Sequence, residues 1–144
     1  MYDRVYRRLS LRDLSMVVQM EGAYWEGFIR EENARQFLSS PTNVLFACIE
    51  EGRVIGFAFG YELCRLDDAG DMLYIHAVEV LEGYRRQGIG RELMRVLKDY
   101  CRLRGLCRFY LFTDETNAAA RALYRSCGGF ENEGSRGFWF NDLD

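Results

Sequence analysis

The sequence predicts a single α/β domain, in the mixed α+β sense: a mostly antiparallel sheet flanked by helices. Three consecutive segments of strand character in the middle of the chain predict antiparallel hairpins. The next helical segment is enclosed by two strand-like segments, and this order predicts one right-handed parallel crossover. The chain has 144 residues, a single proline and no linker-like stretch or internal repeat, so residues 1–144 are expected to form one domain.

The first half of the chain carries short patterns typical of strands and helices. Ser10 can cap the first helix, and Ser39-Ser40-Pro41 ends the second. Gly52 supplies the positive φ that tight hairpin turns often require. In chain order, the expected elements are a strand from Val5 to Leu9, helices from Leu11 to Glu21 and from Glu31 to Leu38, and strands from Val44 to Ile49, Val54 to Leu63 and Met72 to Val80.

The second half contains the clearest helix, from Gly90 to Leu103. Its apolar residues share one face, its arginines and lysine share the other, and Gly105 is expected to end it. The remaining expected elements are a strand from Cys107 to Phe112, a helix from Thr116 to Cys127 that Gly128-Gly129 stops, and a closing strand from Gly137 to Phe140.

Composition excludes several classes of protein. Hydrophobic residues make up 49% of the chain, which excludes intrinsic disorder, and a net charge of −3 argues against a general nucleic-acid binder. The longest apolar run, Val44 to Ile49, is far too short to span a membrane. Five cysteines without a CxxC pair, and a single histidine, predict no metal site. We expect a cytoplasmic protein with reduced thiols.

The most informative segment is Arg85-Arg86-Gln87-Gly88-Ile89-Gly90, between an expected strand and the clearest helix. The first N–H groups of a helix lack intrahelical partners and, together with the helix dipole, attract anions. Glycines allow the backbone to approach an anion closely, and arginines suit phosphate oxygens. The segment predicts a pyrophosphate site; the alternative is an ordinary strand-to-helix turn with solvated arginines.

A second motif lies on the expected final helix. Asn117 and Tyr124 are seven residues apart, so they share a helix face. Taken with the arginine- and glycine-containing segment, this order resembles the GNAT superfamily of acetyl-CoA-dependent N-acetyltransferases over essentially the whole chain. The resemblance implies a splayed pair of parallel strands that holds the cofactor, acetyl-CoA.

The resemblance also implies roles for individual positions. The loop and helix start would hold the pyrophosphate, two strand backbones would pair with the pantetheine arm, and the last helix would touch the arm and the thioester sulfur. The implied cofactor-binding residues are Val78, Val80, Arg85, Arg86, Gln87, Gly88, Ile89, Gly90, Arg91, Asn117, Ala120 and Tyr124.

Within this superfamily, the residues from Thr113 to Ala120 and the double glycine after Tyr124 resemble the aminoglycoside 3-N-acetyltransferase type I branch. That branch usually has a tyrosine where this chain has His76, and an acidic residue where it has Ala77. These departures leave three readings open. They are an acetyltransferase of an aminoglycoside or similar small cationic molecule, an acetyltransferase of a protein or peptide amine, and a non-catalytic coenzyme A-binding sensor.

Acetyl transfer to an amine requires a proton acceptor for the amine and a proton donor for the leaving thiolate. Tyr124 is the candidate acid, because a phenol is protonated at neutral pH. His76, the only histidine, and Glu79 are alternative bases. His76 could instead be a buried strand residue bonded to a carbonyl, and Glu79 could bind a cationic acceptor or pair with Arg85.

The acceptor site is expected to involve Tyr24, Trp25, Glu79 and Asp114. Tyr24 and Trp25 either line the acceptor cleft or simply pack. Glu79 and Asp114 could join Glu115 and the acidic loop from Asp67 to Asp71 in a negative rim that attracts a polycation. The partners expected are a small-molecule amine, no nucleic acid and no membrane, with Phe138-Trp139-Phe140 either pairing across a homodimer or closing the sheet.

Overall fold

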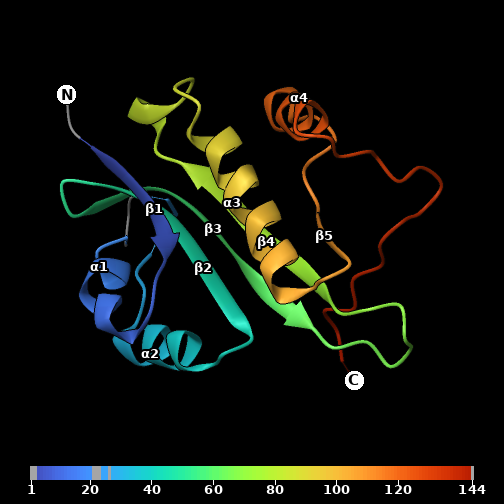
Figure 1. Cartoon of the computed structure of the whole chain (residues 1–144), viewed down its shortest axis with the longest axis horizontal. Coiled ribbons are helices and arrows are strands. Elements are labelled where there is room, and N and C mark those ends of the chain that lie inside the picture. The colour runs from blue at the N-terminus through green and yellow to red at the C-terminus, as the bar shows by residue number, and fades with distance from the viewer. Residues whose placement is uncertain (1–2, 21–23, 26, 144) are drawn as a thin grey trace.

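The computed structural model describes residues 3–20, 24–25 and 27–143. Its five strands form one sheet in the order β1-β2-β3-β4-β5 (Figure 1). The first four strands pair antiparallel, and β4 and β5 pair parallel. The elements are β1 (Arg4–Arg8), η1 (Leu11–Asp13), α1 (Leu14–Val18), α2 (Glu31–Ser39), β2 (Asn43–Glu50), β3 (Arg53–Leu63), β4 (Met72–Val80), η2 (Glu82–Tyr84), α3 (Ile89–Arg104), β5 (Arg108–Leu111) and α4 (Ala118–Ser126). The predicted mixed sheet with one parallel crossover is confirmed.

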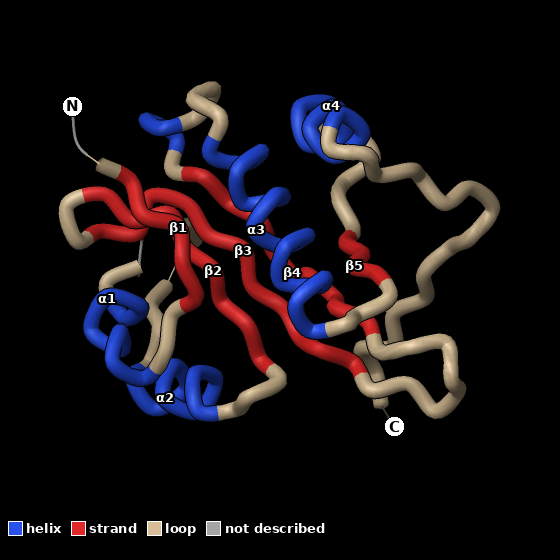
Figure 2. Tube along the Cα trace, in the orientation of Figure 1, coloured by secondary structure: helices blue, strands red, loops and turns tan. Residues whose placement is uncertain are grey.

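Helices cover both faces of the sheet (Figure 2). Side chains alternate between the faces along each strand, so Leu45 and Phe57 pack with α1 and α2. Val44 and Phe46 point the other way, into a core shared with α3. The position of α3 along the sheet therefore follows from the apolar alternation of β2 and β3.

The helix α3 is amphipathic, as its sequence predicts. Leu93 and Leu97 are completely buried, and Met94 is nearly so. Gly105 adopts the left-handed conformation at φ 69°, and its N–H bonds to the carbonyl of Arg102, which ends the helix as expected.

A β-bulge interrupts the pairing of β3 with β4. Phe59 pairs with Ala77 but the next residue, Gly60, pairs with Ile75, so His76 is an extra residue on β4. A Cβ atom on Gly60 would lie 1.9 Å from the carbonyl oxygen of Tyr74. The close approach of these two backbones is therefore possible only with glycine at position 60.

Glu62 ties the end of β3 to the C-terminal half of α3. The Arg104 guanidinium donates two hydrogen bonds to the Glu62 carboxylate, from Nε at 2.9 Å and from Nη2 at 3.0 Å, and the Tyr100 hydroxyl also donates to it. The Glu62 side chain is only 8% exposed. The bond from Arg104, followed by that from Tyr100, holds the pKa of Glu62 below its ordinary value.

Two expected elements differ from the structure. The first helix is split into η1 and the five-residue α1, which ends at Val18, and the expected end at Glu21 lies outside the described residues. The expected strand from Gly137 to Phe140 is not a strand. No ladder pairs with it, and its three rings are 82%, 81% and 78% exposed. A strand requires a paired neighbour, which this aromatic segment lacks among the described residues.

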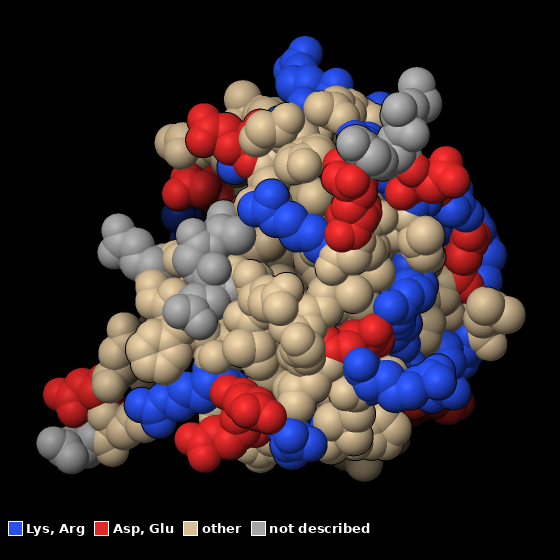
Figure 3. Space-filling view, turned by 90° about the vertical axis from the view of Figure 1, so that its left-hand side faces the viewer, with Lys and Arg blue, Asp and Glu red and all other residues tan. Residues whose placement is uncertain are grey.

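The surface has balanced charge on the side that Figure 3 shows, where Lys and Arg side chains alternate with Asp and Glu side chains. In the part of the chain that is described, no helix has the length and apolar character needed to cross a membrane. Across these same residues, no three His, Cys, Asp or Glu side chains are grouped as metal ligands.

Replacing Gly60 with alanine should destabilise the protein by about 3 kcal/mol or more, because the new Cβ would overlap the Tyr74 carbonyl and force the bulge to move. Gly83→Ala is the matched control, since a Cβ there meets nothing within 4 Å. Chemical denaturation measures both changes. Equal stability of the two variants would contradict the role given to Gly60.

The free energy of unfolding should fall in acid partly through Glu62. Its lowered pKa means that the stabilisation is fully present above the ordinary value of 4.5 and is lost as the pH falls through the lower folded value. Glu62→Gln should cost about 1–2 kcal/mol near neutral pH and flatten this acid dependence. The exposed Glu32→Gln is the control, and denaturation from pH 3 to pH 7 is the measurement. An unchanged acid slope in Glu62→Gln would exclude this carboxylate as its source.

Candidate active site

The parallel strands β4 and β5 separate halfway along β4. Their last paired residues are Ile75 and Leu111, so the segment from His76 to Val80 has no pairing with β5. The Leu81 N–H bonds to Ile55 on β3. Since antiparallel strands direct alternate backbone groups to one neighbour, the backbone groups of Val78 and Val80 point away from β3. They form an open polar edge where the two strands diverge, except that the Val80 carbonyl accepts a hydrogen bond from Arg85.

The N-terminus of α3 lies next to this open edge. Gly88 is the N-cap in the left-handed conformation at φ 85°, and the first helical bond runs from the Glu92 N–H to its carbonyl. The N–H groups of Ile89, Gly90 and Arg91 therefore have no partner within the helix. A Cβ on Gly88 would meet nothing within 4 Å, so the space beside the N-cap of α3 is open.

The loop before α3 is exposed and cationic. Arg86 has a left-handed backbone at φ 65°, a conformation that is costly for residues other than glycine and that occurs often at functional sites. The Arg85 Nε donates to the Val80 carbonyl at 3.2 Å, which links the loop to the open edge of β4. Gln87 accepts a hydrogen bond from Arg4 on β1. Arg85 thus bonds to a backbone oxygen, and the alternative ion pair with Glu79 is not formed.

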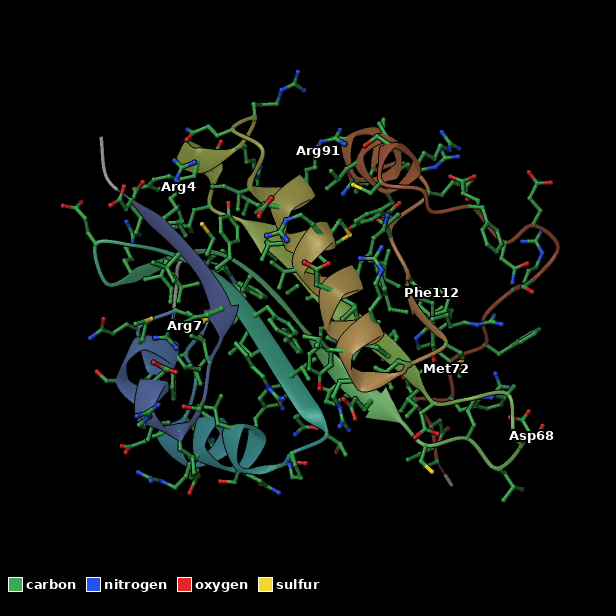
Figure 4. The ribbon with its side chains drawn as sticks, in the orientation of Figure 1. Arg4, Arg7, Asp68, Met72, Arg91 and Phe112 are labelled. Atoms are coloured by element: carbon green, nitrogen blue, oxygen red, sulfur yellow. The ribbon has the colours of Figure 1, made fainter. Side chains whose placement is uncertain are left out.

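Gly90 has a packing role in addition to its predicted role at the cofactor. A Cβ at this position would lie 2.9 Å from Leu123 Cδ2 on α4. Arg91 reinforces the contact, because its Nη2 donates to the Ser126 hydroxyl at 3.0 Å. The helix α4 is therefore held against the first turn of α3 (Figure 4).

The predicted residues of α4 flank the same region. The Asn117 Oδ1 caps the helix by accepting the Ala120 N–H at 3.0 Å, so a ligand would be contacted through the Nδ2 hydrogens of Asn117. Tyr124 is half-buried and packs in the cluster that contains Val78. Burial raises the pKa of the Tyr124 phenol, and the negative charge of Glu79 raises it further. The phenol therefore stays protonated at neutral pH.

His76 occupies the bulge and is exposed, so it is not the buried, carbonyl-bonded strand histidine of the alternative reading. Its Nδ1 lies 3.4 Å from the Tyr74 hydroxyl, and its ring lies 5.3 Å from that of Phe59. Glu79 is also exposed, further along β4. Both candidate bases are thus accessible to solvent beside the open edge.

The expected acceptor residues are only partly brought together. The Tyr24 hydroxyl donates to the Val54 carbonyl at 3.1 Å, and its ring lies 4.6 Å from that of Phe57, so Tyr24 packs against the sheet. Trp25 also contacts Phe57, at 5.9 Å, but is 37% exposed. Asp114 accepts two hydrogen bonds from Thr116, which fixes the turn before α4.

The acidic loop does not join Glu79 in a continuous rim. Asp71 precedes β4 and Glu79 lies near its end, about 26 Å away along an extended strand. Figure 4 shows Asp68 in the loop before β4 and Arg91 beside α4, well apart in this view. Asp67 is paired with Arg65 at 2.6 Å. The acidic loop from Asp67 to Asp71 therefore lies apart from Glu79, and the single rim expected from sequence does not include both.

Two features of the site were missed in the sequence. The first is Gly60, which permits the bulge. The sequence could have indicated it, because a glycine inside a strand often marks a bulge or a close approach of two backbones. Tyr74, Tyr110 and Phe112 form ring contacts next to the strand separation. Strand alternation places Tyr74 and Tyr110 on one face, but their proximity depends on the register between β4 and β5.

Comparison with known proteins identifies relatives. The family model described as "Acetyltransferase (GNAT) family" matches residues 12–129. The chain is 37% identical over 100 residues to N-alpha-acetyltransferase RimI of Mycobacterium tuberculosis (strain ATCC 25618 / H37Rv), an alignment that covers 69% of this chain and 59% of that protein. The chain thus spans about three fifths of the length of this relative.

Two further relatives have names that refer to aminoglycosides. Aminoglycoside N(6′)-acetyltransferase type 1 of Klebsiella aerogenes is 28% identical over 134 residues, covering 85% of this chain and 86% of that protein. The solved structure of an aminoglycoside N-acetyltransferase in complex with CoA superposes with a TM-score of 0.80 at 15% identity, covering 98% and 97% of the two chains. The structural match supports the fold.

Proposed function

The chain belongs to the acetyltransferase (GNAT) family, and from this premise we propose that it transfers an acetyl group from acetyl-CoA directly to a primary amine. The acceptor proposed is an aminoglycoside or a similar small cationic molecule. The observation that carries the proposal is the separation of β4 from β5 beyond Ile75 and Leu111. It leaves an open backbone edge beside both the N-terminus of α3 and Tyr124.

The residues at this edge fit coenzyme A. Unpaired N–H groups from Ile89 to Arg91 and the exposed Arg85 and Arg86 suit a pyrophosphate, and the space beside Gly88 that a Cβ would fill is open. The edge formed by Val78 and Val80 can pair with an extended arm carrying amides, as an added strand would. Asn117 offers its Nδ2 hydrogens from the start of α4.

The bound acetyl-CoA supplies a thioester as acetyl donor. Tyr124 is the proposed acid: burial and Glu79 raise its pKa, so its hydroxyl holds a proton to donate to the departing sulfur. The incoming amine must lose a proton, and His76 and Glu79 are the candidate acceptors. His76 has its Nδ1 beside Tyr74 and leaves Nε2 for this role. Measuring how turnover depends on pH in His76→Gln and in Glu79→Gln distinguishes these two candidates.

A protein or peptide amine is the second candidate acceptor. It is supported by the 37% identity to N-alpha-acetyltransferase RimI. The aminoglycoside reading is supported by the longer alignment with the N(6′)-acetyltransferase. A coenzyme A-binding sensor without chemistry is the third reading.

Release of thiol from acetyl-CoA tests these readings with a panel of amines: several aminoglycosides, a polyamine, an arylalkylamine and an alanine-starting peptide. We expect selective turnover of the small polycations. Turnover of the peptide alone would favour the protein acceptor. Saturable binding of acetyl-CoA without turnover of any amine would favour the sensor.

Replacing Gly88 with alanine should weaken acetyl-CoA binding about tenfold or more, because a Cβ would occupy the open space beside the N-cap, next in the chain to the free N–H groups. Gly105→Ala is a matched control: it places the same residue in the left-handed conformation at the other end of α3, again with open space around it. Both variants should lose similar stability. Calorimetric titration should separate them, and equal affinities would remove Gly88 from the proposed site.

Tyr124→Phe should lower kcat by about 10²–10⁴-fold while leaving the Kd of acetyl-CoA nearly unchanged, because only the proton donor is lost. The raised pKa predicts that wild-type activity does not decline through ionisation of this phenol below pH 10. Steady-state kinetics and titration measure the two quantities. A kcat close to that of the wild type would assign protonation of the sulfur to another group or to water.

A further inference from the structure

Four aromatic side chains gather where β4 and β5 separate. Tyr74 is central: its ring centroid lies 5.3 Å from Tyr110, 6.0 Å from His76 and 6.2 Å from Phe112. We call these four residues the aromatic cluster. Phe112 is 76% exposed and His76 is also exposed, so the cluster faces solvent.

The four rings are inclined to one another at different angles. Tyr74 and Tyr110 are tilted by 34° to one another. His76 stands at 85° to Tyr74, and Phe112 stands at 89° to Tyr110 and at 60° to Tyr74. Tyr74 also stacks on Tyr61 of β3, with ring centroids 6.4 Å apart. The faces of tyrosine and phenylalanine rings attract organic cations, so a group of such rings at an exposed position is a candidate cation site.

The cluster lies on the side of the sheet opposite α3. Leu73 and Ile75 point into the core that contains Leu97 of α3, so Tyr74 points to the other face. His76 and Phe112 are the first residues beyond the last paired residues of β4 and β5, and Phe112 is seen beside β5 in Figure 4. The cluster therefore borders the opening between the strands, across the sheet from Tyr124.

Four carboxylates on β3 and on the loops that flank β4 and β5 are committed to local contacts. Asp67 is paired with Arg65, the Asp71 carboxylate accepts the Arg65 N–H, and Asp114 accepts two bonds from Thr116. Glu62 is bound by Arg104 and Tyr100. These four carboxylates are therefore already engaged, whereas Phe112 of the cluster and the carboxylate of Glu79 are exposed to solvent.

We propose that the rings of Tyr74, Tyr110 and Phe112 in the aromatic cluster bind a non-reacting ammonium group of a polycationic acceptor, while a second amine of the same molecule is acetylated. The inference rests on the proposed acetyl transfer at the strand opening. The reacting amine must be neutral to attack, whereas cation–π attraction requires a charge. An acceptor with two amines satisfies both requirements, because one amine can be neutral and react while the other is charged and bound. The cluster therefore selects acceptors with at least two amines.

Direct binding of choline tests the cluster without any need for catalysis. Choline carries a permanent cation, and 3,3-dimethyl-1-butanol is its neutral isostere. Because His76 is the only histidine, its ring protons give an assignable NMR signal inside the cluster. Choline should shift this signal saturably, at millimolar concentration, and the neutral isostere should not. Equal effects of the two probes, or no effect of either, would overturn the proposal.

Substitutions locate the binding. Phe112→Leu keeps an apolar side chain but removes a ring face at an exposed position, so folding should be unaffected. It should weaken choline binding about 2- to 30-fold, and Tyr74→Leu should do at least as much. Phe130→Leu, an 88% exposed ring outside the cluster, is the control and should change nothing. Equal choline affinity in all three variants would place the cation elsewhere.

Kinetics separate this inference from the proposed function. Phe112→Leu should raise the KM for a diamine acceptor, such as pentane-1,5-diamine, and leave the KM values for the monoamine pentylamine and for acetyl-CoA unchanged. A rise for both amines alike would contradict recognition of a second ammonium. Absence of turnover in the wild type would remove the acetyltransferase proposal, while the choline measurement would still decide whether the cluster binds cations.

Discussion

The close approach of Gly60 to the Tyr74 carbonyl is the constraint on which the site depends. It allows His76 to enter β4 as an extra residue between the partners of Phe59 and Gly60. A bulge bends its strand and increases the local twist. The pairing of β4 with β5 ends at Ile75 and Leu111, immediately before the bulge. The bulge thus lies where the backbone edge of β4 becomes open, and it also turns the His76 side chain toward the aromatic residues on the face opposite α3.

Glycines also set the position of the anion-binding helix end. A Cβ on Gly56 would lie 2.8 Å from Ile89 Cγ2, and a Cβ on Gly90 would lie 2.9 Å from Leu123. The first turn of α3 therefore sits directly on β3 and against α4. At its other end, α3 is held by Glu62 through Arg104 and Tyr100. Fixed at both ends, the helix presents its unpaired N–H groups to the open edge of β4.

Local patterns in the sequence were sufficient for most of the fold. Alternation of apolar residues located β2, β3 and β4, and amphipathic spacing with Gly105 located α3. What depends on distant partners was harder to predict. The expected strand from Gly137 to Phe140 has strand-like residues but no paired neighbour among the described residues. For Tyr24, the choice between lining the acceptor cleft and packing depends on its hydrogen bond to Val54, a distant partner. Likewise, the separation of Glu79 from the acidic loop follows from strand length, and the grouping of Tyr74 with Phe112 follows from the β4–β5 register.

The central claim is that the acetyl donor binds along the edge exposed by the separation of β4 and β5. Amide chemical shifts recorded during titration with coenzyme A test this most directly. The account predicts the largest changes at Val78 and Val80 on β4 and at Ile89 and Gly90 on α3, with little change along β1. Saturable binding that leaves the β4 and α3 amides unchanged would contradict the account.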